Sequence, residues 1–181
     1  FPFIRRSQAG LTASVAGEKL REKREELGYS LNSLSKKIGV TSRMMTKYEN
    51  EDSEVTINRA MKIYDLFGHH VFNEVNVFAR QKKPKSKFES EVSRKYVELG
   101  FEAIDTKKTP FDIIAKKDNE LILTEVSDKV NPQMQSLSKL LDADNLVIFH
   151  RKKPKNIPSM TKKEFLDFEK ANELVRFLKE F

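Results

Sequence analysis

Residues 30–50 read SLNSLSKKIGVTSRMMTKYEN, and this stretch decides the fold of the first half of the chain. Apolar residues recur at helical spacing over residues 31–38, and a second run of the same kind follows the turn. Ser30 and Thr41 each stand directly before one of these runs, where an N-cap is expected. Gly39 permits the positive φ that the turn needs. The stretch therefore predicts two short helices joined by a tight turn, which is a helix-turn-helix motif.

One further helix is predicted on each side of this motif. Residues 18–27 show helical spacing and end at Gly28, and their shared face is formed by Leu20, Arg24 and Leu27. A polar loop over residues 50–55 leads to a helix capped by Thr56 and ended by Gly68, whose apolar side is formed by Ile57, Ala60, Met61, Tyr64 and Phe67. The first domain is thus expected to be all-α and to span residues 1–78, with its core at 17–68. Its arms, residues 1–15 and 71–78, would brace the helices or join two chains.

The helix that follows the turn has two sides with different predicted tasks. Met45 and Tyr48 are three residues apart, so both are expected to face the core. The side chains left for solvent are those of Ser42, Arg43, Thr46 and Lys47. No acidic residue occurs between Glu26 and Glu49. This face therefore offers hydrogen-bond donors and positive charge to a nucleic-acid groove. The alternative is a helical bundle that contacts other proteins.

Residues 17–50, GEKLREKREELGYSLNSLSKKIGVTSRMMTKYEN, resemble the helix-turn-helix of the lambda-repressor/Cro type. The resemblance covers about residues 17–68. It implies that the helix after the turn enters the major groove of double-stranded DNA. It also implies an internal ion pair between Arg24 and Glu49. Asn50 stands where many relatives have glycine. The DNA-contacting residues implied are Ser42, Arg43 and Lys47 at base edges, Met44 against a thymine methyl group, and Ser30 and Thr41 at phosphates.

The second half of the chain predicts a mixed α/β domain over residues 88–181, after a basic linker at 79–87. A helix over residues 87–99 is followed by strands at FEAIDT, FDIIAKK and ELILTEVS, the last two joined by the turn Asp118-Asn119. A helix over residues 132–142, the strand NLVIFHR and a helix over residues 161–180 complete it. The order αβββαβ resembles restriction-endonuclease-like folds. The predicted fold class is therefore an all-α domain followed by a mixed α/β domain.

That resemblance draws attention to four carboxylates of the second half, which are Glu89, Glu91, Asp112 and Glu125. In nuclease-like folds such acids hold Mg²⁺, and a lysine two residues after the last acid helps to activate water. Here Ser127 occupies the lysine position, and Lys129 falls past the expected end of the strand. We therefore predict a degenerate domain that serves binding or assembly, with no catalytic or metal-ligating residue and no cofactor. A divalent-metal-dependent nuclease and an unrelated α/β domain are the alternatives.

Composition and charge limit the function classes. The net charge is +7, and residues 1–85 carry 16 basic and 10 acidic residues, so the excess lies in the first half. A basic half favours a polyanion partner. Cysteine is absent, which excludes disulfides, and no apolar run is long enough to span a membrane. These features favour a cytoplasmic chain. The chain starts with Phe1, so we expect it to be a piece of a longer protein.

Taken over nearly its whole length, the chain resembles a family of archaeal proteins regarded as transcriptional regulators. GEKLREKREELGYSL and the pair GFEAIDT and TPFDIIAK carry this resemblance. It implies a cytoplasmic DNA-binding regulator without an established small-molecule effector. A homodimer is expected, because one short recognition helix reads only a few base pairs.

Overall fold

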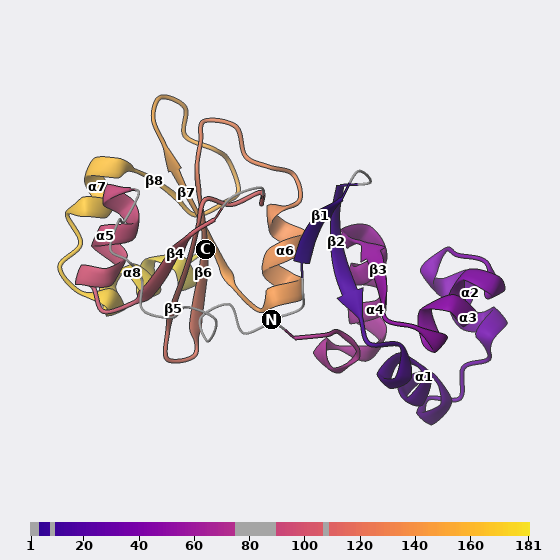
Figure 1. Ribbon diagram of the computed structural model, residues 1–181. Coiled ribbons are helices and arrows are strands. Elements are labelled where there is room, and N and C mark those ends of the chain that lie inside the picture. Colours follow the sequence, from indigo (N-terminus) through magenta and orange to yellow (C-terminus); the bar gives the residue numbers. More distant parts are fainter. Residues whose placement is uncertain (1–3, 8–9, 75–89, 107–108) are drawn as a thin grey trace. The chain divides into compact units, whose positions relative to one another are not determined.

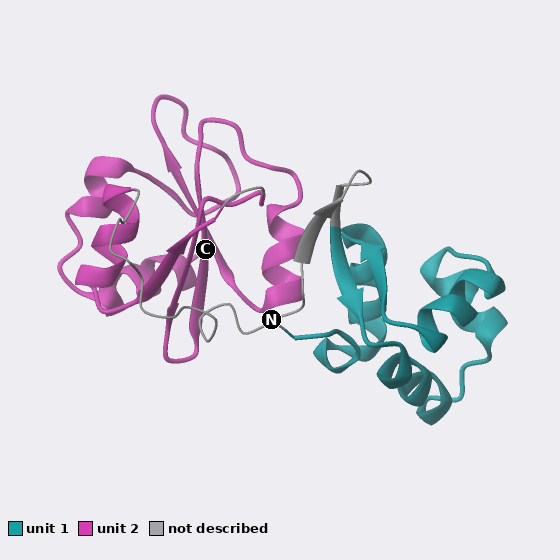
Figure 2. Cartoon of the chain, in the orientation of Figure 1, with its two compact units in different colours: residues 1–77 teal, residues 78–181 magenta. Residues whose placement is uncertain are grey.

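The computed structural model describes residues 4–7, 10–74, 90–106 and 109–181 (Figure 1). The chain divides into two compact units, residues 1–77 and 78–181 (Figure 2). The basic linker at 79–87 and residues 75–78 of the second arm lie outside the described residues. In the described part of the chain, no helix combines the length and apolar character that crossing a membrane requires.

Unit 1 contains the four expected helices. Their bounds are α1 Gly17–Glu26, α2 Leu31–Ile38, α3 Ser42–Asn50 and α4 Ile57–Phe67, followed by the 3-10 turn η1 at His69–Val71. Ser30 and Thr41 are the N-caps of α2 and α3, as predicted: the Ser30 hydroxyl accepts from the backbone N–H of Ser33, and that of Thr41 from Met44. Thr56 precedes α4, but its side chain makes no capping hydrogen bond. Helices this short depend on burial for their stability.

The turn between α2 and α3 is built around Gly39, whose φ of 81° lies in the left-handed region. The backbone N–H groups of Gly39 and Val40 both donate to the carbonyl of Ser35, each at 2.9 Å. Ser35 is buried, and its Oγ lies 3.4 Å from the Oγ of Ser42 at the start of α3. A small side chain at position 35 therefore lets the two helices approach closely.

Unit 1 also contains a sheet that the sequence pattern did not indicate. Strands β1 Ile4–Ser7, β2 Gly10–Val15 and β3 Ser53–Thr56 pair antiparallel in the order β1-β2-β3. The prediction of a polar loop over residues 50–55 is wrong at 53–55. Ser53 and Val55 are buried while Glu54 points outward, and Val55 pairs with Ala13. A four-residue strand whose partner lies about forty residues away shows too little alternation to be recognised.

Some predicted burial within the helices needs correction. Leu20 is fully buried, but Leu27 is 53% exposed because it lies just past the end of α1 and no longer follows its period. On α4, Ile63 is fully buried, whereas Met61 and Tyr64 are only half-buried. Ile57, Ala60 and Phe67 are buried as predicted.

The start of α1 is held by residues far away in the sequence. Ala16, its N-cap, has no side chain that caps the helix, and the backbone N–H of Gly17 instead donates to the Asp52 carboxylate at 3.2 Å. The other oxygen of Asp52 accepts from the amide of Asn73 at 3.1 Å. A Cβ at position 17 would lie 2.6–2.8 Å from the carbonyl oxygens of Tyr48, Glu49 and Glu51. Helix α1 therefore packs against the end of α3 with no room for a side chain.

Unit 2 has the predicted element order αβββαβ as far as β7. Its elements are α5 Glu91–Glu98, β4 Glu102–Asp105, β5 Ile113–Lys117, β6 Glu120–Val126, α6 Met134–Leu141, β7 Asp144–Phe149, β8 Ser159–Thr161, α7 Lys162–Leu166 and α8 Ala171–Lys179. The strands form one sheet in the order β4-β5-β6-β7-β8. Strands β4, β5 and β6 pair antiparallel, whereas β6, β7 and β8 pair parallel. The two-domain α plus α/β fold class is confirmed.

Helices cover both faces of this sheet (Figure 1). On one face α5, α7 and α8 bury a cluster in which the Tyr96 ring packs against Phe101 and Phe165, with centroids 5.5 and 4.9 Å away. The Tyr96 hydroxyl lies 2.6 Å from the Oγ1 of buried Thr124. Helix α6 buries apolar residues of its own on the other face. Burial on both faces explains why the central strands are almost continuously apolar.

Two helix boundaries of unit 2 differ from the prediction. Helix α5 begins at Glu91, because Ser90 is its extended N-cap; residues 87–89 lie outside the described part. The single helix expected over residues 161–180 is instead two helices, α7 and α8, and Thr161 is both the last residue of the unpredicted strand β8 and the N-cap of α7. Phe165 and Leu174 are both fully buried in the same cluster. At about 100° per residue, one straight helix would place them on opposite sides, so the chain must break between them.

We predict that Gly17→Ala destabilises unit 1 by about 1–3 kcal/mol, because the new methyl group must push backbone carbonyls apart. Urea unfolding followed by circular dichroism measures the free energy of unfolding. Lys19→Ala, at an exposed position of the same helix, is the matched control and should change it by less than about 0.5 kcal/mol. Equal stability of the two variants would contradict the close packing at Gly17.

Candidate nucleic-acid interface

Helix α3 exposes the face that the sequence predicted. Ser42, Arg43, Thr46 and Lys47 are exposed, while Met45 and Tyr48 are buried in the core of unit 1. Arg43 and Lys47 are one helical turn apart, and neither forms an ion pair within the described residues. Met44 is 38% exposed, so its apolar side chain is available at the surface as well.

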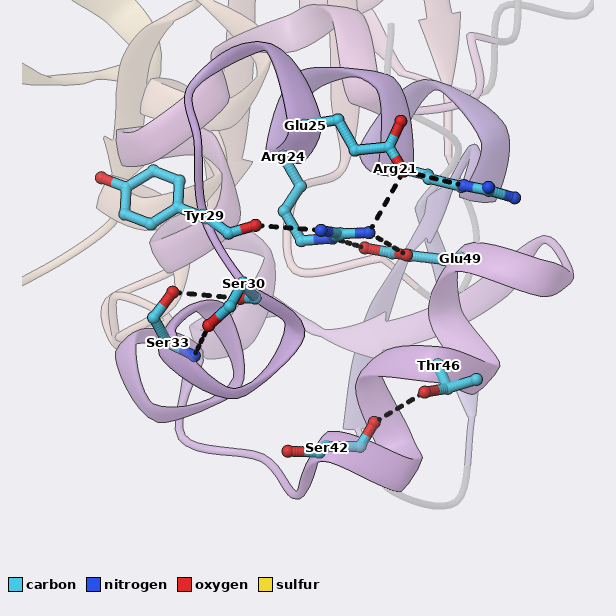
Figure 3. Close-up of polar contacts among 9 residues, drawn as sticks. All are labelled: Arg21, Arg24, Glu25, Tyr29, Ser30, Ser33, Ser42, Thr46 and Glu49. Atoms are coloured by element: carbon cyan, nitrogen blue, oxygen red, sulfur yellow. Dashed lines mark hydrogen bonds and ion pairs between the residues drawn. The ribbon is translucent and has the colours of Figure 1, made fainter.

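The hydroxyl groups of the predicted site also stabilise the helices themselves. Ser30 and Thr41 accept capping bonds of 3.0 and 3.1 Å. The hydroxyl of Thr46 donates to the carbonyl of Ser42 at 3.0 Å, and Figure 3 shows this bond together with the cap at Ser30. All four residues are exposed. Because the Thr46 proton is engaged within the helix, the free donors of α3 are concentrated on Arg43 and Lys47.

The predicted ion pair between Arg24 and Glu49 is present and joins α1 to the end of α3 (Figure 3). Arg24 Nε and Nη2 lie 2.5 and 3.1 Å from the two carboxylate oxygens of Glu49, so the contact is bidentate. Arg24 Nη1 donates to the carbonyl of Tyr29 at 2.9 Å. The two side chains are only 11% and 4% exposed. The hydrogen bond to Glu49 raises the pKa of the Arg24 guanidinium above its usual value, so Arg24 stays charged.

Two cations beside this face were not among the predicted site residues. Lys36 and Lys37 lie in the last turn of α2 and are exposed, with Lys37 Nζ 5.6 Å from the ring centroid of Tyr29. The sequence feature that could have indicated them is the absence of acidic residues between Glu26 and Glu49. They add positive charge to the helix-turn-helix.

In unit 2, two of the acids considered as metal ligands meet at one edge of the sheet. Asp112 directly precedes β5, and Glu125 lies near the end of β6, which runs antiparallel to it. The Asp112 carboxylate accepts from the backbone N–H of Val126 at 2.7 Å. The Glu125 carboxylate accepts from the backbone N–H of Asn131 at 3.0 and 3.2 Å. Asp112 thus holds the last residue of β6, and Glu125 holds the backbone that follows this strand.

The other members of the nuclease-like pattern do not join this pair. Glu91 forms an ion pair with Lys162, and Glu89 lies outside the described residues. Lys129 falls three residues past the end of β6, as expected. Within the described ranges, no three His, Cys, Asp or Glu side chains come together as a metal ion would require. Burial raises the pKa of the Glu125 carboxyl, the Asn131 N–H lowers it, and the charge of Asp112 raises it further.

Comparison with known proteins agrees with this geometry. Residues 20–68 match the family model described as helix-turn-helix, so unit 1 contains a helix-turn-helix domain. Over 99% of its length the chain is 24% identical to a protein of Pyrococcus furiosus, and over 98% it is 26% identical to one of Methanocaldococcus jannaschii. Both are archaeal proteins provisionally named HTH-type transcriptional regulatory proteins. No solved structure matches the chain.

The chain spans 63% of the length of each of these two relatives. A relative from Methanosarcina acetivorans, 26% identical over 99% of the chain, bears the same name and is also covered to 63%. The resemblance to archaeal proteins of this kind is confirmed.

We predict that Glu49→Ala destabilises unit 1 by roughly 2–4 kcal/mol, because the nearly buried guanidinium of Arg24 then loses its carboxylate partner. Urea unfolding measures this loss. The double variant Arg24→Met, Glu49→Leu should recover most of it, since no unpaired charge remains.

The control for this experiment is Arg21→Ala, which breaks the exposed pair between Arg21 and Glu25 on the same helix. It should cost less than about 1 kcal/mol. If Glu49→Ala is no more harmful than Arg21→Ala, the bond between α1 and α3 does not stabilise the unit.

A second prediction concerns Glu125 and pH. The pKa of Glu125 is raised in the folded state. The contribution of this carboxyl to the free energy of unfolding is therefore fully present below its unfolded-state pKa of about 4.3, and it is lost as pH rises through the folded-state pKa. Glu125→Gln keeps an acceptor for Asn131 but cannot ionise. It should therefore stabilise the chain relative to wild type at pH 7, and the gain should shrink toward pH 4.

The free energy of unfolding of the wild type and of Glu125→Gln, measured between pH 4 and pH 7, tests this prediction. The control is Glu102→Gln, at an exposed position of β4. A pH-independent difference for Glu125→Gln would show that burial does not disfavour the charged carboxylate.

Proposed function

We propose that this chain is a sequence-specific, DNA-binding transcriptional regulator whose helix α3 docks in the major groove of double-stranded DNA. One observation carries the proposal: α3 exposes Arg43 and Lys47 with free donors, while its opposite side is buried. The helix-turn-helix match and the names of the archaeal relatives support the same class of function. Such a regulator acts in the cytoplasm of an archaeal cell.

Each exposed residue of α3 has a proposed contact. Arg43 donates two hydrogen bonds to a guanine edge, and Lys47 and Ser42 reach neighbouring bases. Met44 packs against a thymine methyl group. The N-terminal ends of α2 and α3, at Ser30 and Thr41, bind phosphate oxygens, because backbone N–H groups there point outward and the helix dipole favours negative charge. Thr46 contacts DNA through its exposed side chain.

A homodimer follows from the size of the reading surface. A helix of nine residues contacts only a few base pairs, and a two-fold dimer doubles the sequence that is read. Unit 2 serves binding or assembly in this proposal rather than catalysis, because Asp112 and Glu125 each hold a backbone N–H and a serine stands at position 127.

Selection of bound sequences from random double-stranded DNA tests the proposal. We expect enrichment of a palindrome whose half-sites are about one helical turn, or a multiple of it, apart. Failure to enrich any sequence at about 0.15 M salt would overturn the regulator function. Incubation of the chain with DNA and Mg²⁺ or Mn²⁺ tests the nuclease alternative, and cleavage that is lost in Asp112→Ala would replace this proposal with it.

We predict that Arg43→Ala weakens binding to the selected sequence by about 5- to 150-fold, the equivalent of one bidentate contact of 1–3 kcal/mol. Binding to unrelated DNA should weaken much less. Fluorescence anisotropy titrations with both duplexes measure the two affinities.

The matched control is Arg21→Ala, which removes an exposed arginine from α1. It should leave the ratio of the two affinities unchanged. An equal loss on both duplexes for Arg43→Ala would make Arg43 a phosphate contact and not a base contact.

A further inference from the structure

A second cationic surface lies in unit 2, on the loop between β7 and β8. Residues 150–156 read HRKKPKN. The four cations Arg151, Lys152, Lys153 and Lys155 are all exposed, and none forms an ion pair within the described ranges. We call these four residues the basic loop. Four unpaired positive charges in five positions create a local positive potential that attracts anions.

The start of the basic loop is fixed by an acidic side chain from a neighbouring loop. Asp128 Oδ1 accepts hydrogen bonds from three consecutive backbone N–H groups, those of His150 at 2.7 Å, Arg151 at 2.9 Å and Lys152 at 3.4 Å. Bonds from the N–H groups of Arg151 and His150 lower the pKa of the Asp128 carboxyl. Three converging N–H groups form an anion-binding nest, which Asp128 fills from within the chain. The backbone is thereby held while the cationic side chains remain free.

A fifth cation, Lys129, lies near the loop, and side-chain hydrogen bonds hold its backbone too. Lys129 is exposed, and both its backbone N–H and its carbonyl are hydrogen-bonded to the hydroxyl of Ser127, at 3.0 and 2.9 Å. Ser127 itself donates its backbone N–H to the carbonyl of Ile148, three residues before Arg151, the first residue of the basic loop. The segment that carries Lys129 thus lies beside the end of β7.

Three acidic side chains near this surface accept hydrogen bonds from other groups of the chain. Asp128 is occupied by the three N–H groups. Glu164, which feels the charge of Lys153, accepts from the backbone and hydroxyl of Thr161 in a capping box. Asp112, at the same edge of the sheet, is bonded to Val126. The five cations of the basic loop and Lys129 outnumber these three carboxylates, so the surface has a positive excess.

The side chains of the basic loop favour one polyanion over others. The large apolar side chains that are exposed in the described part of the chain are Leu27, Met44, Val97 and Phe181, and none belongs to the loop. A membrane-binding loop would insert apolar residues, and a single-strand-binding loop would offer aromatic rings for stacking. Positive charge without either is suited to the phosphates of duplex DNA.

We propose that the basic loop and Lys129 form a second DNA-binding surface that contacts phosphates of double-stranded DNA without reading the bases. This proposal rests on duplex DNA as the partner of the chain, but not on base reading by α3. The surface raises the affinity of the full chain for any duplex and makes it more sensitive to salt. It gives unit 2 a role in DNA binding that does not depend on nuclease chemistry.

The test compares the full chain with the triple variant Arg151→Gln, Lys152→Gln, Lys153→Gln on a duplex of unrelated sequence. Each phosphate contact contributes about 0.9 to the slope of log affinity against log salt. We expect the slope to become shallower by up to about 2.7 and the affinity near 0.15 M salt to fall by roughly tenfold. The control is the triple variant Lys116→Gln, Lys139→Gln, Lys170→Gln, which removes equal charge from exposed positions elsewhere in unit 2.

Equal losses in the two triple variants would overturn the proposal, because net charge alone would then explain the binding. An unchanged affinity in the loop variant would overturn it as well. A third outcome would also overturn it. If the loop variant loses binding to vesicles that contain anionic lipid but still binds DNA like the unmodified chain, the basic loop is a membrane contact.

A further variant separates failure of this proposal from failure of the proposed regulator function. The double variant Arg43→Ala, Lys47→Ala removes the proposed base-reading cations of α3 and is measured on the same duplexes. If the chain selects no sequence and this variant has no effect, but the loop variant still weakens binding, base reading by α3 fails and the second surface stands. If only the α3 variant weakens binding, the second surface fails.

Discussion

The bidentate ion pair between Arg24 and Glu49 is the contact on which the geometry of unit 1 depends. Helix α3 has nine residues, too few to be stable alone in water. Met45 and Tyr48 attach one side of it to the core, but apolar contacts by themselves allow a helix to slide or rotate. The guanidinium fixes the last turn of α3 against α1 and, through the carbonyl of Tyr29, fixes the entrance to α2 as well. All three helices of the motif therefore meet at one side chain.

Unit 2 uses carboxylates in a comparable way at the edge of its sheet. Asp112 accepts from the backbone N–H of the last residue of β6, and Glu125 and Asp128 accept from backbone N–H groups of the connections that follow β6 and β7. A residue pattern typical of metal chemistry thus serves here to order the backbone. Binding a metal ion and ordering the backbone need the same residue types at nearly the same positions. In both cases the carboxylates must lie where the ends of several strands meet at one edge of the sheet. Ser127, at the position where nuclease-like folds carry lysine, is the sequence feature that predicts the non-catalytic use.

Local signals predicted most of the helices and the order of unit 2. Ser30, Gly39 and Thr41 act on residues one to four positions away, so their effects can be read from a short window of sequence. Met45 and Tyr48 were assigned to the core from spacing alone. The pairing of Arg24 with Glu49 came from family resemblance, since nothing in the spacing joins residues 25 positions apart.

The features that escaped prediction depend on distant partners. Strand β3 is defined by its pairing with β2, and the Asp52 carboxylate caps a helix that begins 35 residues earlier. The closed space around Gly17 is created by carbonyls at the end of α3. The break before α8 arises because Phe165 and Leu174 must share one core. None of these constraints exists within a single window of sequence.

The hydrogen bonds of Asp52 also have a mechanical consequence. They join the first residue of α1, the turn after α3 and Asn73 at a single point, and Asn73 is further bonded to Ser14 of β2. Asn73 is close to the place where the chain leaves unit 1. Tension applied to the chain beyond residue 74 therefore enters the domain two residues from the end of α3. Because Asn73 is bonded both to Asp52 and to Ser14, a pull on the chain beyond this residue is shared between the end of α3 and strand β2.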